Sequence, residues 1–496
     1  MINKDNCIPT SSIPLFTADE FHSRICSLLR NNNMRCLSYC AVPKDFGFLL
    51  ICAIANDETQ CIDLSSVEIR TKNMRSITAE HYAIHAFERE MHENYGIEFY
   101  GHPWLKPLRY PADRFDRTQT AENYPFYTIS GDDLHEVGVG PIHAGIIEPG
   151  HFRFICEGEK VLHLEIMLGY QHRGIERLML ETSSELKRIL LAESIAGDTA
   201  IGHATAYVEA IENLAGYEIS ERLQIERTIA LELERIAVHL GDTSALCLDI
   251  AYQLGQVACE ALRTIVINTF QAWCGNRFGK GLIRAAGTQY PLTETTAKLI
   301  RQNLKEVHER YRQVSNCFFN LPSVLARFEG IGILSAEQAR LVGLVGPAAR
   351  SAGLARDLRK TLPTQYYRKL NHEIITHDTG DVLARLKQRV AEVDQSISLI
   401  QILLDIHAKS EEKFNPPEYK LKLAPNSLCI STVEGWRGEI CHLLMTDHAG
   451  QIIFCKLKDP SFHNWMGLAL AVRDQQISDF PICNKSFNLS YCGHDL

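Results

Sequence analysis

The sequence predicts an α+β protein in which a small N-terminal α+β domain is followed by a larger, mostly helical domain with a rim of strands. The chain has 496 residues, which is more than one hydrophobic core usually holds, so two or three domains are expected. Runs rich in β-forming residues lie near both ends of the chain. Apolar residues at helical spacing dominate residues 174–312 between them.

The N-terminal domain begins with a predicted helix at residues 17–29. Thr17 and Glu20 have the spacing of a capping box, and apolar residues then recur at helical intervals. Three runs rich in β-formers follow this helix, at residues 35–42, 46–55 and 60–69.

A second helix is predicted from near Thr78 to Gly96, where the glycine can end it. Three histidines of this helix, His81, His85 and His92, share one face, which we interpret as a solvated polar face rather than a metal site. The polar stretch 112–127 is the predicted linker, so the two domains are placed at 1–118 and 119–496.

The second domain is predicted to open with a hairpin at residues 152–168 that turns at Glu157–Gly158–Glu159. Long helical segments follow from Gly174 to about Arg312, and a further helical block covers 336–408. Strands return at the end of the sequence, in residues 427–435, 439–446 and 451–457.

Composition excludes several classes of protein. Apolar residues make up 45% and charged residues 22%, which is typical of a folded globular chain. The net charge is −9 and no basic stripe is present, so no nucleic-acid partner is expected. No run approaches the ~18–20 apolar residues that cross a bilayer, and the N-terminus has no signal-peptide pattern. We therefore expect a cytoplasmic chain that can dock onto a membrane partner.

The sixteen cysteines are scattered, and none forms a Cys-x-x-Cys pair. Zinc sites and ligated iron–sulfur clusters usually show such pairs, so no metal, no cluster and no disulfide framework of the chain's own are predicted. The closest pair, Cys36 and Cys40, is four residues apart in a β-rich run. We expect both to be buried thiols on the same face of a strand.

The stretch ESIAGDT at residues 193–199, with His203 beyond it, raises a question about a metal site. If the stretch is helical, Ala196, Thr199 and His203 lie on one face, where two reactive side chains could hold a metal. The first two positions instead carry a methyl group and a hydroxyl.

Two sets of motifs carry a resemblance to known families. FEREMHENYGIEFYGHP at residues 87–103 resembles the signature of the 30-kDa subunit of respiratory complex I. Residues 138–496 resemble the complex I 49-kDa subunit and the related large subunit of nickel–iron hydrogenases. This second resemblance lies in seven blocks in the family order: residues 140–154, 169–178, 231–242, 276–287, 346–359, 433–439 and 479–496. The fused arrangement looks closest to the formate hydrogenlyase and hydrogenase-4-type enzymes.

The resemblance implies that a metal pocket has lost its ligands. Nickel–iron hydrogenases hold their metals with two Cys-x-x-Cys pairs, and alignment places these four cysteines on Ala196, Thr199, Ser490 and Gly493. These side chains cannot replace thiolates for a soft metal, so the nickel–iron centre is expected to be absent. Cys492 is displaced by one residue from the pattern.

Complex I proteins use the same cavity for quinone, held by a histidine and a tyrosine. The histidine matches His143, whereas the tyrosine falls on Gly197, so only one of the two quinone ligands is retained. The resemblance thus makes a quinone a possible cofactor and His143 its ligand.

Three further residues receive roles by resemblance. Arg173 matches an arginine that faces the nearest iron–sulfur cluster of a partner subunit, where a fixed cation raises the potential. Glu176 and His203 match catalytic positions of the hydrogenase pattern, and Glu176 there passes protons away from the metal. The alternative is a surface ion pair between Arg173 and Glu176, three residues apart.

Four other charged residues of the matched blocks are interpreted as a buried ionic frame rather than as catalysts. Buried charges need partners, and these blocks supply both signs. The residues are Asp242, Arg350, Asp357 and Arg437.

Two hypotheses about function remain open. In the first, the chain is an oxidoreductase subunit that passes electrons between a small iron–sulfur partner subunit and a quinone-like or unknown acceptor, on top of membrane-embedded ion-translocating subunits. In the second, it is a non-catalytic scaffold that couples its partners to such a membrane arm. In both, the chain lies peripherally on the cytoplasmic side of the cell membrane. NADH binding is not expected, because no Gly-x-Gly-x-x-Gly motif is present.

Overall fold

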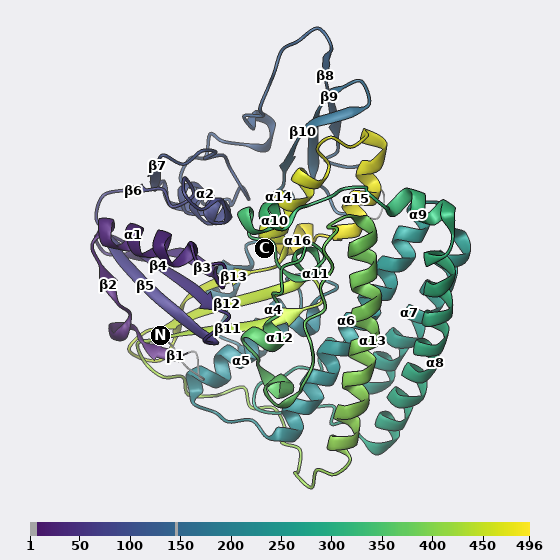
Figure 1. Cartoon of the computed structure of the whole chain (residues 1–496). Coiled ribbons are helices and arrows are strands. Elements are labelled where there is room, and N and C mark those ends of the chain that lie inside the picture. Colours follow the sequence, from purple (N-terminus) through teal and green to yellow (C-terminus); the bar gives the residue numbers. More distant parts are fainter. Residues whose placement is uncertain (1–6, 144–146) are drawn as a thin grey trace.

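The computed structural model describes residues 7–143 and 147–496, and its main elements form four layers (Figure 1). Two N-terminal helices cover the first four-stranded sheet, whose other face packs on a second four-stranded sheet. The second sheet in turn lies on a bundle of long helices. This arrangement confirms the predicted α+β class, with a small N-terminal domain and a mostly helical second domain.

The first sheet has the strand order β2-β5-β4-β3, and the three predicted β-rich runs form its antiparallel strands β3, β4 and β5. The predicted capping box of α1 is also present, because Thr17 and Glu20 each bind the other's backbone N–H. The elements of this domain are β2 (Leu15–Phe16), α1 (Ala18–Leu29), β3 (Met34–Lys44), β4 (Gly47–Asn56), β5 (Cys61–Ile69), β6 (Asn73–Arg75), η2 (Tyr82–Ile84), α2 (His85–Tyr95) and β7 (Glu98–Tyr100).

A bulge in β3 separates the two closest cysteines. Cys36 and Cys40 are both buried, as expected, but the register shifts between Cys36 and Ser38. Cys36 therefore packs under α1 and α2, whereas Cys40 faces the second sheet. The prediction that they share a face is wrong, because one extra residue in a strand reverses the facing of all later side chains.

The second predicted helix starts later than expected, at His85 rather than near Thr78. The buried Glu88 carboxylate accepts hydrogen bonds from the Ile77 N–H (2.7 Å) and the Thr78 hydroxyl (2.7 Å), which holds that segment as a loop. The expected solvated face is also wrong, because His85 is buried and His81 and His92 are half-buried. Gly96 ends the helix in the left-handed conformation, as predicted.

Charged residues of α2 join the N-terminal domain to the second domain. Glu90 pairs with Arg109 and with Lys456 of the second sheet (2.5 Å), and all three are buried. Removing one partner of such a buried set leaves an uncompensated charge, so the set fixes how the two domains meet.

The second sheet, of order β1-β11-β12-β13, is covered on both faces. Its first strand comes from the N-terminal end of the described chain, so this sheet is built from both ends of the sequence. Every residue of β11 and β12 is buried. The strands are β1 (Cys7–Pro9), β11 (Ser427–Gly435), β12 (Gly438–Thr446) and β13 (Ile452–Lys458), and the last three match the predicted runs.

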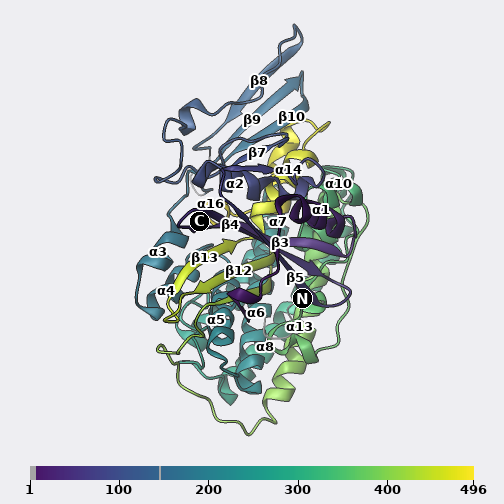
Figure 2. The same cartoon turned by 90° about the vertical axis from the view of Figure 1, so that its left-hand side faces the viewer.

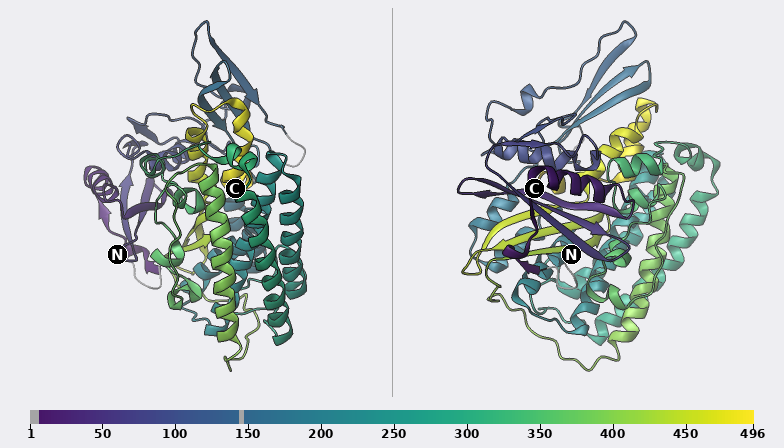
Figure 3. Two further views of the ribbon diagram at one scale, coloured as in Figure 1. Left: turned by 45° about the vertical axis from the view of Figure 1, so that its right-hand side comes forward. Right: turned by 60° about the vertical axis from the view of Figure 1, so that its left-hand side comes forward.

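The helix bundle lies beside this sheet, and its long helices run side by side (Figure 3, left). The predicted helical region 174–312 is largely confirmed, with a non-helical break between α7 and α8. The predicted helical block 336–408 is only partly confirmed, because residues 370–381 form no helix. The bundle contains α5 (Ala200–Ala215), α6 (Glu221–Asp249), α7 (Gln253–Cys274), α8 (Glu294–Phe319) and α13 (Val382–His407). No helix among residues 7–143 and 147–496 is long and apolar enough to cross a membrane.

A three-stranded sheet, β8 (Leu134–Val139), β9 (His151–Glu157) and β10 (Lys160–Met167), projects from the top of the molecule (Figure 2). Its hairpin turns where the sequence predicts. The remaining elements surround the site or connect these layers: η1 (Thr10–Ser12), η3 (Ala121–Asn123), α3 (Ile175–Glu181), α4 (Glu185–Ala192), α9 (Pro322–Phe328), α10 (Ala336–Leu341), α11 (Gly346–Arg350), α12 (Leu358–Thr361), η4 (Gln365–Lys369), α14 (Ser461–Ala471), η5 (Ile477–Asp479), α15 (Phe480–Phe487) and α16 (Tyr491–Asp495).

Candidate functional site: a pocket without thiolates

The ESIAGDT stretch forms the turn that leads into α5. Thr199 is the residue before the helix, and its N–H donates to the Ala196 carbonyl (3.0 Å). The condition under which Ala196, Thr199 and His203 would share a helix face is therefore not met. His203 lies one turn inside α5, and its N–H donates to the Thr199 carbonyl (3.2 Å).

The Arg173 guanidinium joins this turn to the C-terminal segment. It donates to the carbonyls of Ser194 (2.6 Å), Ile195 (2.8 Å) and Cys492 (3.1 Å). The residues beside these carbonyls are Ala196 and Gly493, two of the four positions that align with metal-binding cysteines. A guanidinium satisfies several acceptors in a fixed geometry, so it holds the two segments together.

The Arg437 guanidinium, in the turn between β11 and β12, makes a second link between the same segments. It donates to Asp198 (2.7 Å), to the Thr199 hydroxyl (3.2 Å) and to the Asn488 carbonyl (2.6 Å). Trp436 also donates its indole N–H to the Thr199 hydroxyl (3.1 Å). The Thr199 hydroxyl, which aligns with a metal-binding cysteine, therefore accepts hydrogen bonds from two donors.

The Asp459 carboxylate fills the space that a side chain at position 493 would need. A Cβ built on Gly493 would lie 2.7 Å from Asp459 Cγ, which is closer than real contacts allow. Asp459 follows directly after β13, accepts a hydrogen bond from the Ser461 N–H (2.8 Å), and is completely buried. Its other oxygen lies 3.0 Å from His203 Nε2.

His203 also lies 3.1 Å, through Nδ1, from Nε2 of the buried His442 on β12. Burial raises the pKa of Asp459, but the hydrogen bond and charge of His203 and the charge of Arg437 more than offset this and lower it to about 2. Burial, and then His203, hold the pKa of His442 well below its usual value. The result is a carboxylate at one end of a hydrogen-bonded chain that runs through His203 to His442.

These residues do not fit a nickel–iron centre. Methyl, hydroxyl and hydrogen groups stand at the four aligned positions, and Asp459 occupies the volume beside one of them. The neighbouring Cys492 does not compensate, because burial raises the pKa of its thiol to about 11. Its sulfur lies 3.4 Å from the Ser490 hydroxyl.

Glu176 binds the second sheet rather than Arg173. Its carboxylate accepts from the Leu457 N–H (2.8 Å) and lies 3.0 Å from Lys456 Nζ. Lys456 also pairs with Glu90, so Glu176 is linked to the N-terminal domain. The alternative of a surface pair between Glu176 and Arg173 is wrong, because each has these other partners.

His143 lies at the edge of the same region, half-buried between aromatic rings. Its ring centroid is 5.6 Å from that of Phe152 and 6.3 Å from that of Tyr491. Its Nε2 is buried without a hydrogen-bond partner among the described residues, and burial lowers its pKa. One unpartnered nitrogen fits a single quinone carbonyl, but Gly197, where the second ligand aligns, is exposed and has no side-chain atom to offer.

The structure brings three of the four candidate residues to the C-terminal segment, whereas the fourth, Glu176, binds β13. Arg173 binds the Cys492 carbonyl, His203 reaches Asp459 beside Gly493, and His143 lies near Tyr491. Sequence reasoning missed Asp459, His442 and Tyr491. The block DFPICNKSFNLSYCGHDL contains Tyr491, but no local pattern assigns it a neighbour from residues 140–150.

The predicted ionic frame is confirmed. Each of its four members has a partner of opposite charge: Arg350 with Glu392 (2.9 Å), Asp357 with Arg359 (2.7 Å), Asp242 with Arg389 (2.6 Å) and Arg437 with Asp198 (2.7 Å). The four pairs are supplied by α6, α11, α12, α13, the turn before α5 and the turn between β11 and β12.

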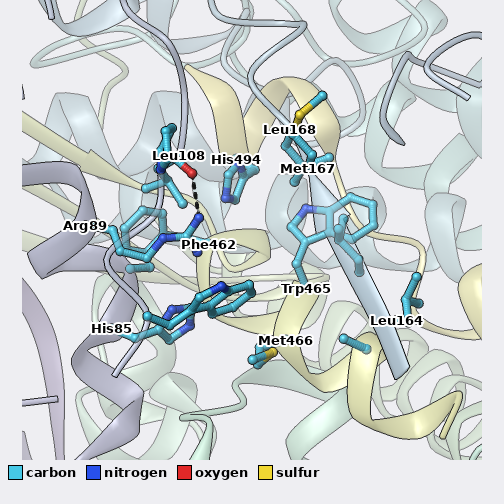
Figure 4. A pocket seen from close by; sticks show the side chains of 15 residues that line it. His85, Arg89, Leu108, Leu164, Met167, Leu168, Phe462, Trp465, Met466 and His494 are labelled. Atoms are coloured by element: carbon cyan, nitrogen blue, oxygen red, sulfur yellow. Dashed lines mark hydrogen bonds between the residues drawn. The ribbon is translucent and has the colours of Figure 1, made fainter. Parts of the chain in front are cut away.

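A small cavity between the domains is too small for a cofactor. Its volume is about 40 Å³, which suits a few water molecules at most. His85, Arg89, Trp465 and His494 line it, and Arg89 donates to the Pro107 carbonyl (2.6 Å; Figure 4). His85 Nδ1 and Trp465 Nε1 have no hydrogen-bond partner within the described part of the chain.

One group of side chains in the N-terminal domain offers metal-ligand atoms. His22, Cys26 and Glu80 bring them within 4.8 Å of one another. Arg30 (3.2 Å) and Arg75 (3.3 Å) both pair with the Glu80 carboxylate, and their charges oppose a cation there. We therefore assign no metal to this group.

Comparison with known proteins relates both domains to subunits of respiratory-chain NADH dehydrogenase. Residues 17–126 match the family of the respiratory-chain NADH dehydrogenase 30 Kd subunit, and residues 255–495 match that of the 49 Kd subunit. The chain is 28% identical over 427 residues to formate hydrogenlyase subunit 5 of Escherichia coli (strain K12), covering 82% of this chain and 74% of that protein. It is 29% identical over 384 residues to an NADH-quinone oxidoreductase protein of Phocaeicola vulgatus, covering 71% and 73%.

A solved structure has the same fold. It is the membrane-bound sulfane sulfur reductase, an archaeal respiratory membrane complex, one chain of which superposes with a TM-score of 0.68 at 24% identity. The match covers 75% of this chain and 100% of that chain.

The chain therefore carries fused domains of the complex I type. More particularly, it is a fused protein in which a 30-kDa-subunit domain precedes a 49-kDa-subunit domain, as the motifs predict.

Two glycines of the pocket provide a matched test of how it is filled. Gly493→Ala should clash with Asp459, and overpacking of this kind costs about 1–3 kcal/mol. Gly197→Ala should be close to neutral, because a Cβ there meets nothing within 4 Å. Thermal unfolding midpoints would check both, and equal midpoints for the two variants would contradict the packing of Asp459 against Gly493.

Glu234 on α6 should make stability fall as pH rises. Its buried carboxylate accepts from the Ile201 (2.7 Å) and Gly202 (3.2 Å) N–H groups at the start of α5, and burial raises its pKa to about 8 from 4.5. The folded state then keeps a proton that the unfolded state releases, so stability falls between pH 4.5 and pH 8.

The Glu234→Gln variant should lose much of this dependence, on the order of a few kcal/mol across that range. Unfolding midpoints measured at several pH values would show it, with the exposed Glu309→Gln as the control. A Glu234→Gln profile that runs parallel to the wild-type profile would show that this carboxyl does not carry the effect.

Proposed function

We propose that the chain is a peripheral subunit of a membrane-associated, ion-translocating complex related to complex I and to the membrane-bound hydrogenases. Relatives bear the names of subunits of such complexes, among them formate hydrogenlyase subunit 5 and a membrane-bound hydrogenase subunit alpha of Pyrococcus furiosus. The chain would lie on the cytoplasmic side, between a small iron–sulfur subunit and membrane-embedded ion-translocating subunits.

In this proposal the chain takes part in electron transfer from the iron–sulfur partner to a quinone-like acceptor, without a nickel–iron centre. The observation that carries it is the set of charged side chains around the four aligned positions. Arg173, His203 and the ionic frame persist around positions that have lost every aligned thiolate. All four aligned cysteines are replaced, while the surrounding charged residues are kept. This combination favours a changed function over a loss of function.

In this proposal, the role of each candidate residue follows from its position. His143 would donate to one carbonyl of the acceptor from its unpartnered Nε2, and Phe152 and Tyr491 would form the apolar wall. A bound quinone supplies the capacity to accept two electrons and two protons. Arg173 is exposed and would place a fixed cation toward the partner's cluster. Glu176 and His203 are the proposed proton-handling side chains.

The alternative function is a non-catalytic scaffold, and three observations favour it. Asp459 fills the volume beside Gly493, and Arg173 uses its donors on backbone carbonyls of the chain itself. Gly197 also leaves the second quinone carbonyl without a donor. Under this alternative, the buried pairs serve only to transmit conformational change between partners.

The discriminating experiment uses the intact complex, purified through a tag on this chain. We expect an iron–sulfur EPR signal from a partner subunit that is reduced by dithionite and reoxidised by a soluble quinone analogue. His143→Ala should abolish the reoxidation, because it removes the proposed donor. His135→Ala, an exposed histidine on β8, should leave it unchanged.

The outcomes separate the two functions. A complex without any cluster signal, or one whose signal ignores the quinone analogue, would refute electron transfer to a quinone and favour the scaffold. If the cluster signal of His143→Ala responds to the quinone analogue as the wild type does, His143 is not part of the quinone site.

A further inference from the structure

A second, larger cleft lies where the N-terminal domain meets the segment around α10. Its volume is about 250 Å³, and we call it the interdomain cleft. One wall comes from the end of α1, the start of β3 and η2, and the other from α10 and the residues that follow it. The two walls touch where η2 contacts α10.

Three arginines line this cleft, and two of them lack a counter-charge. Arg35 is fully paired, with Asp57 and with Glu439 (2.6 Å). Arg340 and Arg356 form no ion pair with any residue in 7–143 or 147–496. Arg356 makes one long hydrogen bond, to the Asn32 carbonyl (3.4 Å).

The acidic side chains of the cleft do not neutralise these two guanidiniums. Glu80 already pairs with Arg30 and Arg75. Glu337 is an exposed residue in the first turn of α10. Burial is the largest cause that lowers the pKa of Arg356 to about 10; the charges of Arg35 and Arg340 lower it further, and the charges of Asp57 and Glu439 only partly offset this.

A guanidinium that is partly removed from water without a counter-charge is unfavourable, and an oxyanion relieves this cost. The planar fork of an arginine suits two oxygens of one anion. Arg356 is half-buried and the exposed Arg340 adds a second guanidinium at the cleft, so together they match the double charge of a phosphate better than the single charge of a carboxylate. The apolar side chains of Leu29, Met34 and Val345 also line the cleft, and the organic part of a small molecule can pack against them.

We propose that the interdomain cleft binds a phosphate group, free or carried by a small molecule, with Arg340 and Arg356 as its counter-charges. This site lies outside the pocket of His203 and Asp459 and does not depend on the function proposed above. Because the ligand would bind the folded chain, it would raise the stability of the folded state by an amount that grows with the logarithm of its concentration above Kd.

The test is a titration of the full-length protein with inorganic phosphate, and in a second arm with glycerol phosphate, at constant ionic strength set by chloride. Calorimetry and the thermal midpoint are the readouts. The wild type should bind in a saturable manner with a rising midpoint. A response to both probes assigns a bare phosphate site, and a response to glycerol phosphate alone assigns an organic phosphate.

Arg340→Gln/Arg356→Gln should lose this response, whereas Arg301→Gln/Arg310→Gln, two arginines on α8 that pair with Asp405 and Glu306, should keep it. The loss is interpretable only if the variant folds, and its midpoint without phosphate should equal or exceed that of the wild type because like charges are removed. If the double variant does not fold, the exposed Arg340→Gln alone should weaken binding about tenfold.

No saturable binding by the wild type would overturn the proposal. So would equal binding by Arg340→Gln/Arg356→Gln, because the anion would then lie elsewhere on the protein.

Discussion

The contact of the Asp459 carboxylate with His203 and Gly493 is the constraint on which the pocket depends. A carboxylate without exposure to solvent is unfavourable unless its oxygens are satisfied, and here His203 and the Ser461 N–H satisfy them. That arrangement requires a residue without a side chain at position 493. The loss of a thiolate at this position and the placement of Asp459 are therefore one structural feature.

Two guanidiniums hold the rest of the pocket around that contact. Arg173 and Arg437 each bind both the turn before α5 and the C-terminal segment, although these segments are far apart in sequence. In a relative with metals, metal–ligand bonds would join the same two segments. Here charge-assisted hydrogen bonds join them, which explains how the framework persists without thiolates.

Much of the fold could be predicted because its signals are local. The capping box at Thr17, the strand runs and the hairpin at Gly158 are set by residues within a few positions of one another. The predictions that were wrong depend on features that no short stretch of sequence shows. A bulge separated Cys36 from Cys40, and the start of α2 depends on Glu88 binding a loop ten residues away. The Asp459 contact joins positions for which the sequence offers no common pattern.

The most direct test of the central claim is metal analysis of the intact complex, purified without chelators from cells grown with added nickel. An account in which Asp459 fills the pocket predicts nickel far below one atom per chain, whatever the iron content of partner subunits. One nickel per chain, lost in a His203→Ala variant that still assembles, would contradict it.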